Sequence, residues 1–309
     1  MISFQNVSKK FKTDFWATPF LALDDISFEL PQNKIIGFLG ANGAGKTTSL
    51  KILLGYIMPT AGKVHFSESL GQNRKEIMSN LGYFPERPYF YPHLTGREFI
   101  SFMSELHGMS DKNIKKETIR LSERFKIDHA LDRKIHNYSK GMLQRLGFIT
   151  AIIHNPKIII LDEPLSGLDP IGRKEFKDVI VELNRNGKTV FFSSHIVPDM
   201  EEICQTVIYL EKGKLVYQGP IDKIIRENIR PDFTIAVHMH QEYSGNVPVK
   251  LVLKNIEEKN YFYNVKAEDK EMFIQDVLNK EGTIFNLQQN KPSLEDIFYK
   301  IRNVDNGTT

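Results

Sequence analysis

Eight consecutive residues carry the clearest chemistry in this chain, because their spacing matches the pattern G-x-x-x-x-G-K-[ST]. Glycines in such a run let successive backbone N–H groups point inward, and a following helix adds its positive N-terminal end. The result is a cradle for a polyphosphate, in which we expect Lys46 to reach the β- and γ-phosphates and Thr47 to bind Mg²⁺. The residues predicted to bind the nucleotide are Gly40, Asn42, Gly43, Ala44, Gly45, Lys46, Thr47 and Thr48.

Two acidic residues and a histidine could complete a phosphoryl-transfer site. Asp162 and Glu163 end an apolar run that begins at Ile158, which is typical of a central parallel strand. Neighbouring residues on a strand point to opposite faces, so we assign Asp162 to Mg²⁺ and Glu163 to the attacking water as general base. His195 follows the next predicted strand, at 189–192, and could touch the γ-phosphate. The predicted catalytic residues are Lys46, Glu163 and His195.

The residues around the glycine-rich run favour a nucleotide site over a turn without a ligand. The apolar residues 35–39 predict a buried strand before it, and residues 48–54 predict the start of a helix after it. The acids also follow a buried strand of the same kind, and ligand sites of open α/β sheets lie at the carboxyl ends of such strands. A solvated strand end is the alternative for the acids taken alone.

An N-terminal β layer is predicted by alternating residues at 2–7 and 26–30. Aromatic residues in or beside this layer could stack on adenine, since every base offers a π-face. Phe11 is the first candidate, and Phe15 or Trp16 in the aromatic segment that follows are alternatives. Ordinary packing of Phe11 is equally compatible with the pattern.

A change of composition near residues 229–231 predicts a linker between two domains. Residues 1–228 would form an α/β domain with a helical insertion at about 85–137, where Thr95 and Glu98 are spaced as a capping box. Residues 229–309 would form a small α+β domain without a catalytic constellation. Its predicted strands and helices lie at 233–239, 249–253, 261–265, 269–280, 282–287 and 293–301.

Charge and composition argue against several other classes. The net charge of +3 is too small to predict nucleic-acid binding, and we expect none. Cys204 is the only cysteine, so a disulfide within the chain is impossible and a thiolate metal cluster is not expected. The N-terminus lacks a signal-peptide pattern, and no apolar run approaches 18 residues, so a soluble protein is predicted.

Beyond these motifs, residues 1–225 resemble the nucleotide-binding domains of ABC transporters. Tyr138-Ser139-Lys140-Gly141-Met142 stands where that family has its signature, Leu165-Ser166-Gly167-Leu168-Asp169 resembles its D-loop, and Ser194-His195 resembles its switch histidine. The resemblance implies a P-loop NTPase of ABC type, with a parallel-sheet core, an N-terminal antiparallel β layer and a helical insertion. It also implies that two copies pair head to tail around two ATP molecules. The further nucleotide contacts that it implies are Ser139, Gly141 and Asp169.

Three residues depart from the family pattern. Glu86 stands where the family usually has a glutamine that touches Mg²⁺ and water, and its carboxylate can still be a metal ligand. In the signature, Lys140 replaces a glycine and Met142 a glutamine. Lys140 could face ATP or point to solvent. None of these changes removes a group that hydrolysis requires, so ATPase activity is expected.

The C-terminal residues 292–298 are similar to the tail of ATPase subunits from bacterial exporters whose permease is a separate chain. The resemblance therefore implies an ATPase that powers export from the cytoplasmic face of the cell membrane, bound to an integral membrane permease. The aromatic residues 89–91 could receive a permease helix or pack internally. The alternative function is a soluble ABC ATPase acting on ribosomes or DNA, although the chain has one cassette and no basic tail.

Overall fold

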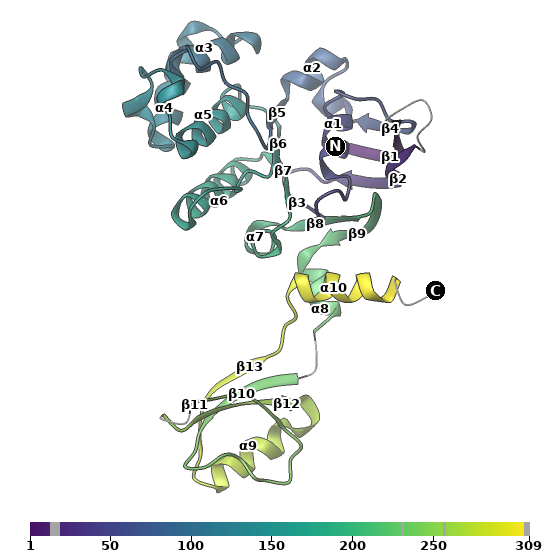
Figure 1. The fold of residues 1–309 in the computed structure, drawn as a ribbon, viewed down its shortest axis with the longest axis vertical. Helices are drawn as coiled ribbons and strands as arrows, with labels where there is room; N and C mark the ends of the chain where they lie inside the picture. The colour runs from purple at the N-terminus through teal and green to yellow at the C-terminus, as the bar shows by residue number, and fades with distance from the viewer. Residues whose placement is uncertain (13–18, 230–231, 256–257, 306–309) are drawn as a thin grey trace. The chain divides into compact units, whose positions relative to one another are not determined.

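The structure is a computed structural model that describes residues 1–12, 19–229, 232–255 and 258–305. The chain forms two compact units, Met1–Ile221 and Asp222–Thr309, which are coloured by residue number in Figure 1. Phe15, Trp16 and part of the predicted linker lie outside the described residues.

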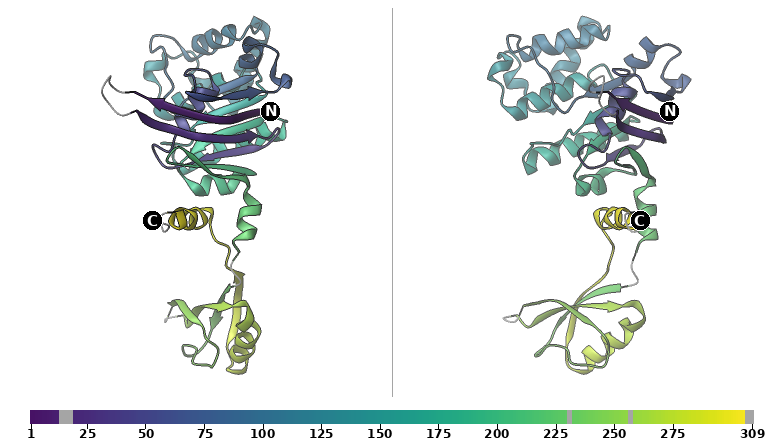
Figure 2. Two further views of the ribbon diagram at one scale, coloured as in Figure 1. Left: turned by 90° about the vertical axis from the view of Figure 1, so that its right-hand side faces the viewer. Right: turned by 45° about the vertical axis from the view of Figure 1, so that its right-hand side comes forward.

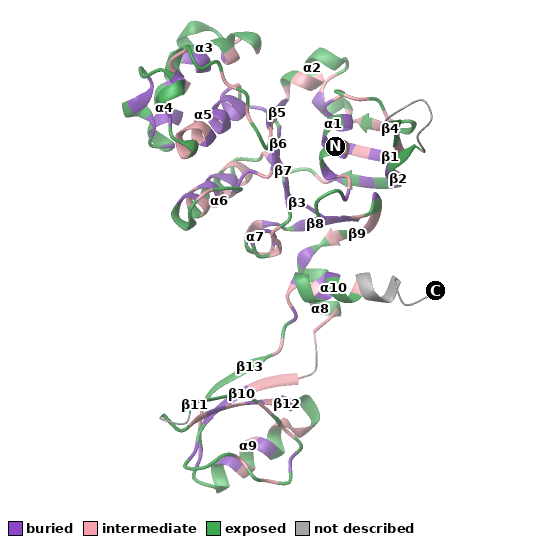
Figure 3. Ribbon diagram, viewed as in Figure 1, coloured by how far each residue is buried: buried purple, intermediate pink, exposed green. Residues whose placement is uncertain are grey.

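A six-stranded sheet forms the centre of the first unit, in the order β5-β6-β7-β3-β8-β9. The strands from β5 to β8 are parallel, and β9 pairs antiparallel with β8. Strands β3, β6 and β7 are buried along their whole length, as apolar runs covered on both faces should be (Figure 3). The bounds are β3 Ile35–Leu39, β5 Leu81–Phe84, β6 Ile158–Asp162, β7 Thr189–Ser194, β8 Thr206–Glu211 and β9 Lys214–Pro220.

An antiparallel sheet in the order β2-β1-β4 forms the N-terminal layer of this unit, and Figure 2 shows its long strands in front of the central sheet. The rings of Phe4 and Phe28 stack at 4.3 Å between centroids. Phe28 in turn lies 5.8 Å from Phe38 of the central sheet, so aromatic contacts join the two sheets in one core. The bounds are β1 Ile2–Phe11, β2 Phe20–Leu30 and β4 Ala61–Phe66.

Helices α3, α4 and α5 form the insertion between strands β5 and β6 (Figure 1). The predicted capping box is present at the start of α3: Thr95 N–H donates to Glu98 Oε2 at 2.6 Å, and Glu98 N–H donates to Thr95 Oγ1 at 3.1 Å. The Phe148 ring of α5 lies 5.2 Å from that of Phe176 on α6, which packs the insertion against the core. The helices of this unit are α1 Lys46–Leu53, α2 Arg74–Ser79, α3 Gly96–Leu106, α4 Asp111–Arg124, α5 Lys140–Ile152, α6 Pro170–Arg185 and α7 Val197–Ile203, with 3₁₀ turns at Glu68–Leu70, Asp128–Ala130 and Ile135–Asn137.

The second unit contains an antiparallel sheet in the order β11-β12-β10-β13. Helix α9 covers one of its faces, where Phe273 and Val277 pack on Tyr263 and other buried residues. Helices α8 and α10 lie side by side in Figures 1 and 2. The bounds are α8 Ile221–Glu227, β10 Asp232–His238, β11 Lys250–Asn255, β12 Asn260–Lys266, the 3₁₀ turn Ala267–Asp269, α9 Lys270–Asn279, β13 Thr283–Gln289 and α10 Leu294–Asp305.

Three helices of the structure have no counterpart among the predicted elements: α2, α7 and α8. Each has only six or seven residues, too short to display a helical repeat of apolar residues. The sequence pattern predicts a helix over residues 174–186, but helix α6 begins earlier, at Pro170, because Asp169 caps it and Pro170 occupies its first turn. The division of the chain after Ile221 likewise precedes the predicted domain boundary at 228.

Candidate nucleotide-binding and hydrolysis site

The glycine-rich loop links β3 to α1 and contains two residues in the left-handed region. Gly43 has φ 82° and Gly45 has φ 105°. Residues with a Cβ atom rarely adopt such positive φ values, whereas glycine adopts them readily. Space also requires glycine at position 45, because a Cβ there would lie 2.6 Å from Leu23 Cδ2 and 2.9 Å from the Ala22 carbonyl oxygen. Helix α1 begins immediately afterwards at Lys46, so its N-terminal N–H groups close the predicted anion cradle.

The Lys46 side chain is held inside this loop. Its Nζ donates to the Gly40 carbonyl oxygen at 2.6 Å and lies 3.7 Å from Glu163 Oε1. Only 7% of the side chain is exposed. Burial lowers the pKa of Lys46, while Glu163 and Asp162 act in the opposite direction. An ammonium group already held by carbonyl oxygens and a carboxylate is available to phosphate oxygens without a large rearrangement.

The two acids lie where β6 ends, but they do not share the strand as the sequence suggested. Asp162 is the last residue of β6 and is buried. Glu163 follows the strand with φ 50°, so the prediction that alternation along a strand separates the two side chains was wrong. A left-handed residue turns the chain at this point, and that turn brings Glu163 toward Lys46 and His195.

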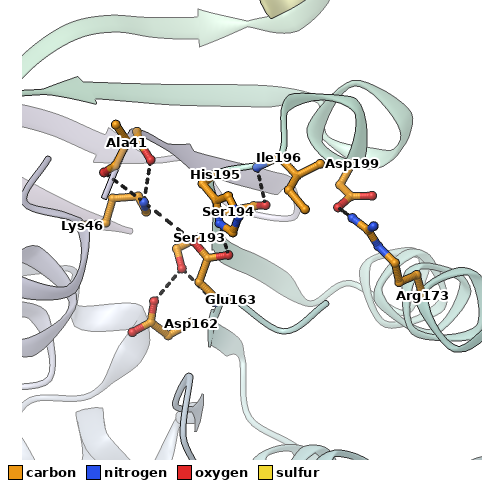
Figure 4. Close-up of polar contacts among 11 residues, drawn as sticks. Ala41, Lys46, Asp162, Glu163, Arg173, Ser193, Ser194, His195, Ile196 and Asp199 are labelled. Carbon is orange, nitrogen blue, oxygen red and sulfur yellow. Dashed lines mark hydrogen bonds and ion pairs between the residues drawn. The ribbon is translucent and has the colours of Figure 1, made fainter. Parts of the chain in front are cut away.

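A single buried hydroxyl group joins both acids. Ser193, paired with Asp162 across the parallel strands β6 and β7, donates from Oγ to Asp162 Oδ1 at 2.6 Å. The same oxygen accepts the Glu163 backbone N–H at 2.9 Å (Figure 4). Burial raises the pKa of Asp162, and the Ser193 hydrogen bond works against that rise.

His195 contacts the predicted general base directly. Its Nδ1 lies 3.0 Å from Glu163 Oε2, and about half of the histidine side chain is exposed. The neighbouring Ser194 points elsewhere, since its hydroxyl accepts the Ile196 N–H at 2.9 Å. Lys46, Glu163 and His195 therefore form one continuous polar chain at the carboxyl end of the sheet (Figure 4).

These groups open into one cavity of about 300 Å³. Glu86 lies in its wall together with Asp162 and Thr47, so all three predicted metal ligands face the same space. Gly40 and Ala44 of the same loop are not among the lining residues: the Gly40 carbonyl oxygen accepts a hydrogen bond from Lys46, and Ala44 is buried in the core. The lining residues are Phe20, Ala22, Ala41, Asn42, Gly43, Gly45, Lys46, Thr47, Thr48, Glu86, Asp162, Glu163, Ser166 and His195.

Phe20, rather than Phe11, lines the cavity. Phe11 ends β1 and pairs with Phe20 across the sheet, and the Lys9 ammonium lies 5.1 Å from the Phe11 ring centre. Phe20 is 61% exposed at the start of β2, so its ring could stack on an adenine bound in this cavity. The sequence contained the signal, an aromatic beginning the second strand, but the strand was predicted to start only at residue 26.

The further nucleotide contacts that the resemblance implies, Ser139, Gly141 and Asp169, are not among the residues that line this cavity. Ser139 caps α5 by accepting the Met142 N–H at 3.3 Å, and Asp169 caps α6 by accepting the Gly172 N–H at 3.0 Å. The Lys140 side chain lies over Gly167, whose added Cβ would be 2.1 Å from Lys140 Nζ. Gln144 Nε2 donates to the Ser166 carbonyl oxygen at 2.6 Å. The signature helix thus contacts the 165–169 loop of its own chain.

The cavity residues fit Mg²⁺ together with a polyphosphate. Thr47, Glu86 and Asp162 offer oxygen ligands, which Mg²⁺ prefers, and phosphates and waters usually complete its shell. Over the described ranges there is no group of three His, Cys, Asp or Glu side chains that could hold a metal by themselves. The fold and the site define a P-loop nucleotide hydrolase.

Comparison with known proteins identifies the family within this class. The family profile described as ABC transporter matches residues 23–166. An uncharacterised ABC transporter ATP-binding protein of Nostoc sp. is 34% identical over 299 residues, covering 95% of this chain and 87% of the relative. The bacitracin transport ATP-binding protein BcrA of Bacillus licheniformis is 38% identical over 209 residues, 67% of each chain.

Solved structures agree with this assignment. An ATP-binding subunit of an ABC transporter has a TM-score of 0.65 at 25% identity, covering 74% of this chain and 92% of that one. A bacterial ABC transporter cassette solved as a dimer has a TM-score of 0.64 at 23% identity, covering 72% and 99%. This chain belongs to the ATP-binding proteins of ABC transporters. It is an ATP-binding subunit and an ATPase, and the predicted ABC-type fold is confirmed.

Replacing the shared hydroxyl tests whether it positions both acids. Ser193→Ala leaves the Glu163 N–H and Asp162 Oδ1 without this partner, so we expect a stability loss of about 1–3 kcal/mol. Turnover should fall more than ATP affinity, because Glu163 loses its orientation while the phosphate loop is intact. Ser194→Ala is the matched control and should keep turnover close to wild type. Equal turnover in the two variants would contradict the positioning role.

The buried Asp162 carboxylate should make the ligand-free protein less stable as pH rises. Its raised pKa means that folding disfavours the ionised form, so its contribution to stability is full below the ordinary value near 4 and is lost above the raised value. Asp162→Asn should therefore raise the melting temperature at pH 8 and change it little at pH 4. Asp178→Asn, at an exposed position on α6, should give no such pH-dependent gain.

Proposed function

We propose that this ATPase subunit pairs with a second copy around two Mg²⁺–ATP molecules and powers export through a separate integral membrane permease. In this proposal the chain works at the cytoplasmic face of the membrane. None of the described helices has the length and apolar character needed to cross a bilayer. The observation that carries the proposal is the contact of Glu163 with both Lys46 and His195 at the mouth of the phosphate loop.

The assigned roles follow from these contacts. Lys46 and the loop N–H groups would bind the phosphates, and Mg²⁺ held by Thr47 and Asp162, with Glu86 nearby, would neutralise charge on them. Glu163 would accept a proton from the attacking water, while His195 would orient that carboxylate and reach the γ-phosphate. Proton acceptance by a positioned base is worth about 10²–10⁴-fold in rate.

Pairing of two copies is supported by the position of the signature. Ser139, Gly141 and Asp169 do not line the cavity of their own chain. Among the described residues, no atom lies within 4 Å of a Cβ built on Gly141, apart from its own helix backbone and chain neighbours. Because α5 is long and begins at this point, its N-terminus could receive the triphosphate of a second copy. Head-to-tail pairing would then complete each site.

A groove of about 370 Å³ on the first unit suits the permease. It lies between β5, α3 and α5, and its wall includes Tyr56, Tyr89 and Phe90. Tyr89 is 80% exposed, whereas the Phe90 ring packs 5.2 Å from Phe99. The aromatic loop therefore combines internal packing at Phe90 with an exposed ring that could anchor a partner helix. The direction of transport rests on the likeness of residues 292–298 to exporter subunits.

Glu163→Gln should keep ATP binding while removing the proton acceptor. We expect turnover to fall by about 10²–10⁴-fold and an ATP-bound dimer to accumulate, detectable by size-exclusion chromatography with light scattering. Glu271→Gln, at an exposed position on α9, removes the same charge far from the acids and should behave as wild type. Turnover of Glu163→Gln within twofold of wild type would contradict the assignment of the base.

The permease interface has its own test. Affinity purification from detergent-solubilised membranes should recover an integral membrane protein together with this chain. Tyr89→Glu should reduce that recovery strongly, since it places a charge on the proposed anchor. Tyr299→Glu, at another exposed tyrosine, should not. Recovery of ribosomes or DNA in place of a membrane protein would support the soluble alternative.

A further inference from the structure

Strand β13 is an edge strand of the sheet in the second unit. It pairs with β10 on one side, and in the described part of the chain no strand pairs with its other side. All of its residues except Ile284 are exposed. An edge strand of this kind presents a row of backbone N–H and C=O groups that can pair with another strand.

The composition of β13 does nothing to prevent such pairing. Residues 283–289 read Thr-Ile-Phe-Asn-Leu-Gln-Gln, without a charge, a proline or a glycine, and the nearest charged residues along the chain are Glu281 and Lys291. Proteins normally protect exposed edges with charges, especially lysine, or with proline. The opposite edge strand, β11, carries Lys250 and Lys254. One edge of this sheet is therefore protected and the other is not.

We infer that the free edge of β13 pairs antiparallel with β13 of a second copy, joining two four-stranded sheets into one. The occupant is a second copy because a charge-free strand can meet itself without opposing like charges. Self-pairing of β11 would bring lysines of both copies together. The inference goes beyond the proposed function, since this contact lies in the second unit and needs no nucleotide.

The register of the sheet shows how self-pairing could match side chains. Leu287 pairs with Ile235 and lies on the face covered by α9, whereas Asn286 pairs with Ala236 and lies on the other face. A two-fold axis at Leu287 sets this leucine opposite its own copy. It also sets Asn286 opposite Gln288 of the second copy. Apolar groups then meet each other, amides meet amides, and each pair shares one face.

Pairing would also remove exposed apolar surface from water. Leu287 is 42% exposed and Phe285 is 52% exposed, although both belong to strand β13. The register shifts between Ala236 and Val237, so Phe285 has no partner residue on β10. The centre of its ring lies 5.9 Å from that of Phe262. Regular pairing is therefore expected from Asn286 onward.

Disulfide trapping in the absence of ATP and Mg²⁺ tests this contact. Leu287→Cys would face its own copy within about 5.5 Å between Cα atoms, a separation that a disulfide can bridge. Leu253→Cys, at a 61% exposed position on β11, is the matched control. Burial raises the pKa of the native Cys204 thiol well above its ordinary value, which keeps it from interfering. We expect Leu287→Cys to form dimers roughly 1,000-fold faster, because pairing raises the local thiol concentration from micromolar to millimolar.

A second pair of variants separates this contact from the nucleotide-dependent one. Leu287→Lys should abolish association of the ATP-free protein, whereas Leu253→Lys should not. With Glu163→Gln added, the Leu287→Lys protein should still dimerise on ATP, through the first unit. Equal trapping of the two cysteine variants, or ATP-free association that survives Leu287→Lys, would overturn the inference. Loss of only the ATP-dependent dimer would count against the proposed function instead.

Discussion

The buried hydroxyl of Ser193 holds two neighbouring acids in different backbone positions. Asp162 must remain at the end of a buried strand, while Glu163 must leave that strand to meet Lys46 and His195. The hydroxyl donates to the first and accepts from the backbone of the second. A non-glycine residue held at φ 50° costs of order 1–3 kcal/mol, so the surrounding contacts must hold it in place. The parallel pairing of β6 with β7 supplies that hydroxyl at the required position.

The same site concentrates buried charge. Lys46 and Asp162 are both mostly buried. Burial lowers the pKa of Lys46 and raises the pKa of Asp162, which favours the neutral form of each side chain. A protein without a ligand gains little from such an arrangement. A polyphosphate with Mg²⁺ would satisfy the cation and the anion together, which links ligand binding to stability. This stabilisation exists only while the nucleotide is bound. It could therefore drive the pairing of two copies, and hydrolysis of the nucleotide could reverse that pairing.

Local patterns predicted much of the fold and the site. The phosphate loop was visible because its glycines are required by backbone angles and by the close approach of Leu23. Buried strands such as β6 were visible as short apolar runs. The left-handed Glu163 was not predictable, because nothing in Asp-Glu-Pro states where the strand stops. The sequence does not reveal that Phe20 lines the cavity or that Lys140 lies over Gly167. In both cases the tertiary fold brings together parts of the chain that local patterns do not connect.

The central claim is that the cradle of one copy is completed by the signature of another, and a mixing experiment tests it most directly. Lys46→Ala disables the cradle, and Ser139→Arg disables the signature, so each protein alone should be inactive. In a mixed dimer, one cradle and one signature would both be intact at the same site. Mixing equal amounts should restore ATPase activity to about a quarter of wild type, since half of the dimers would carry one working site out of two. Activity that stays at the level of the separate variants would contradict the account.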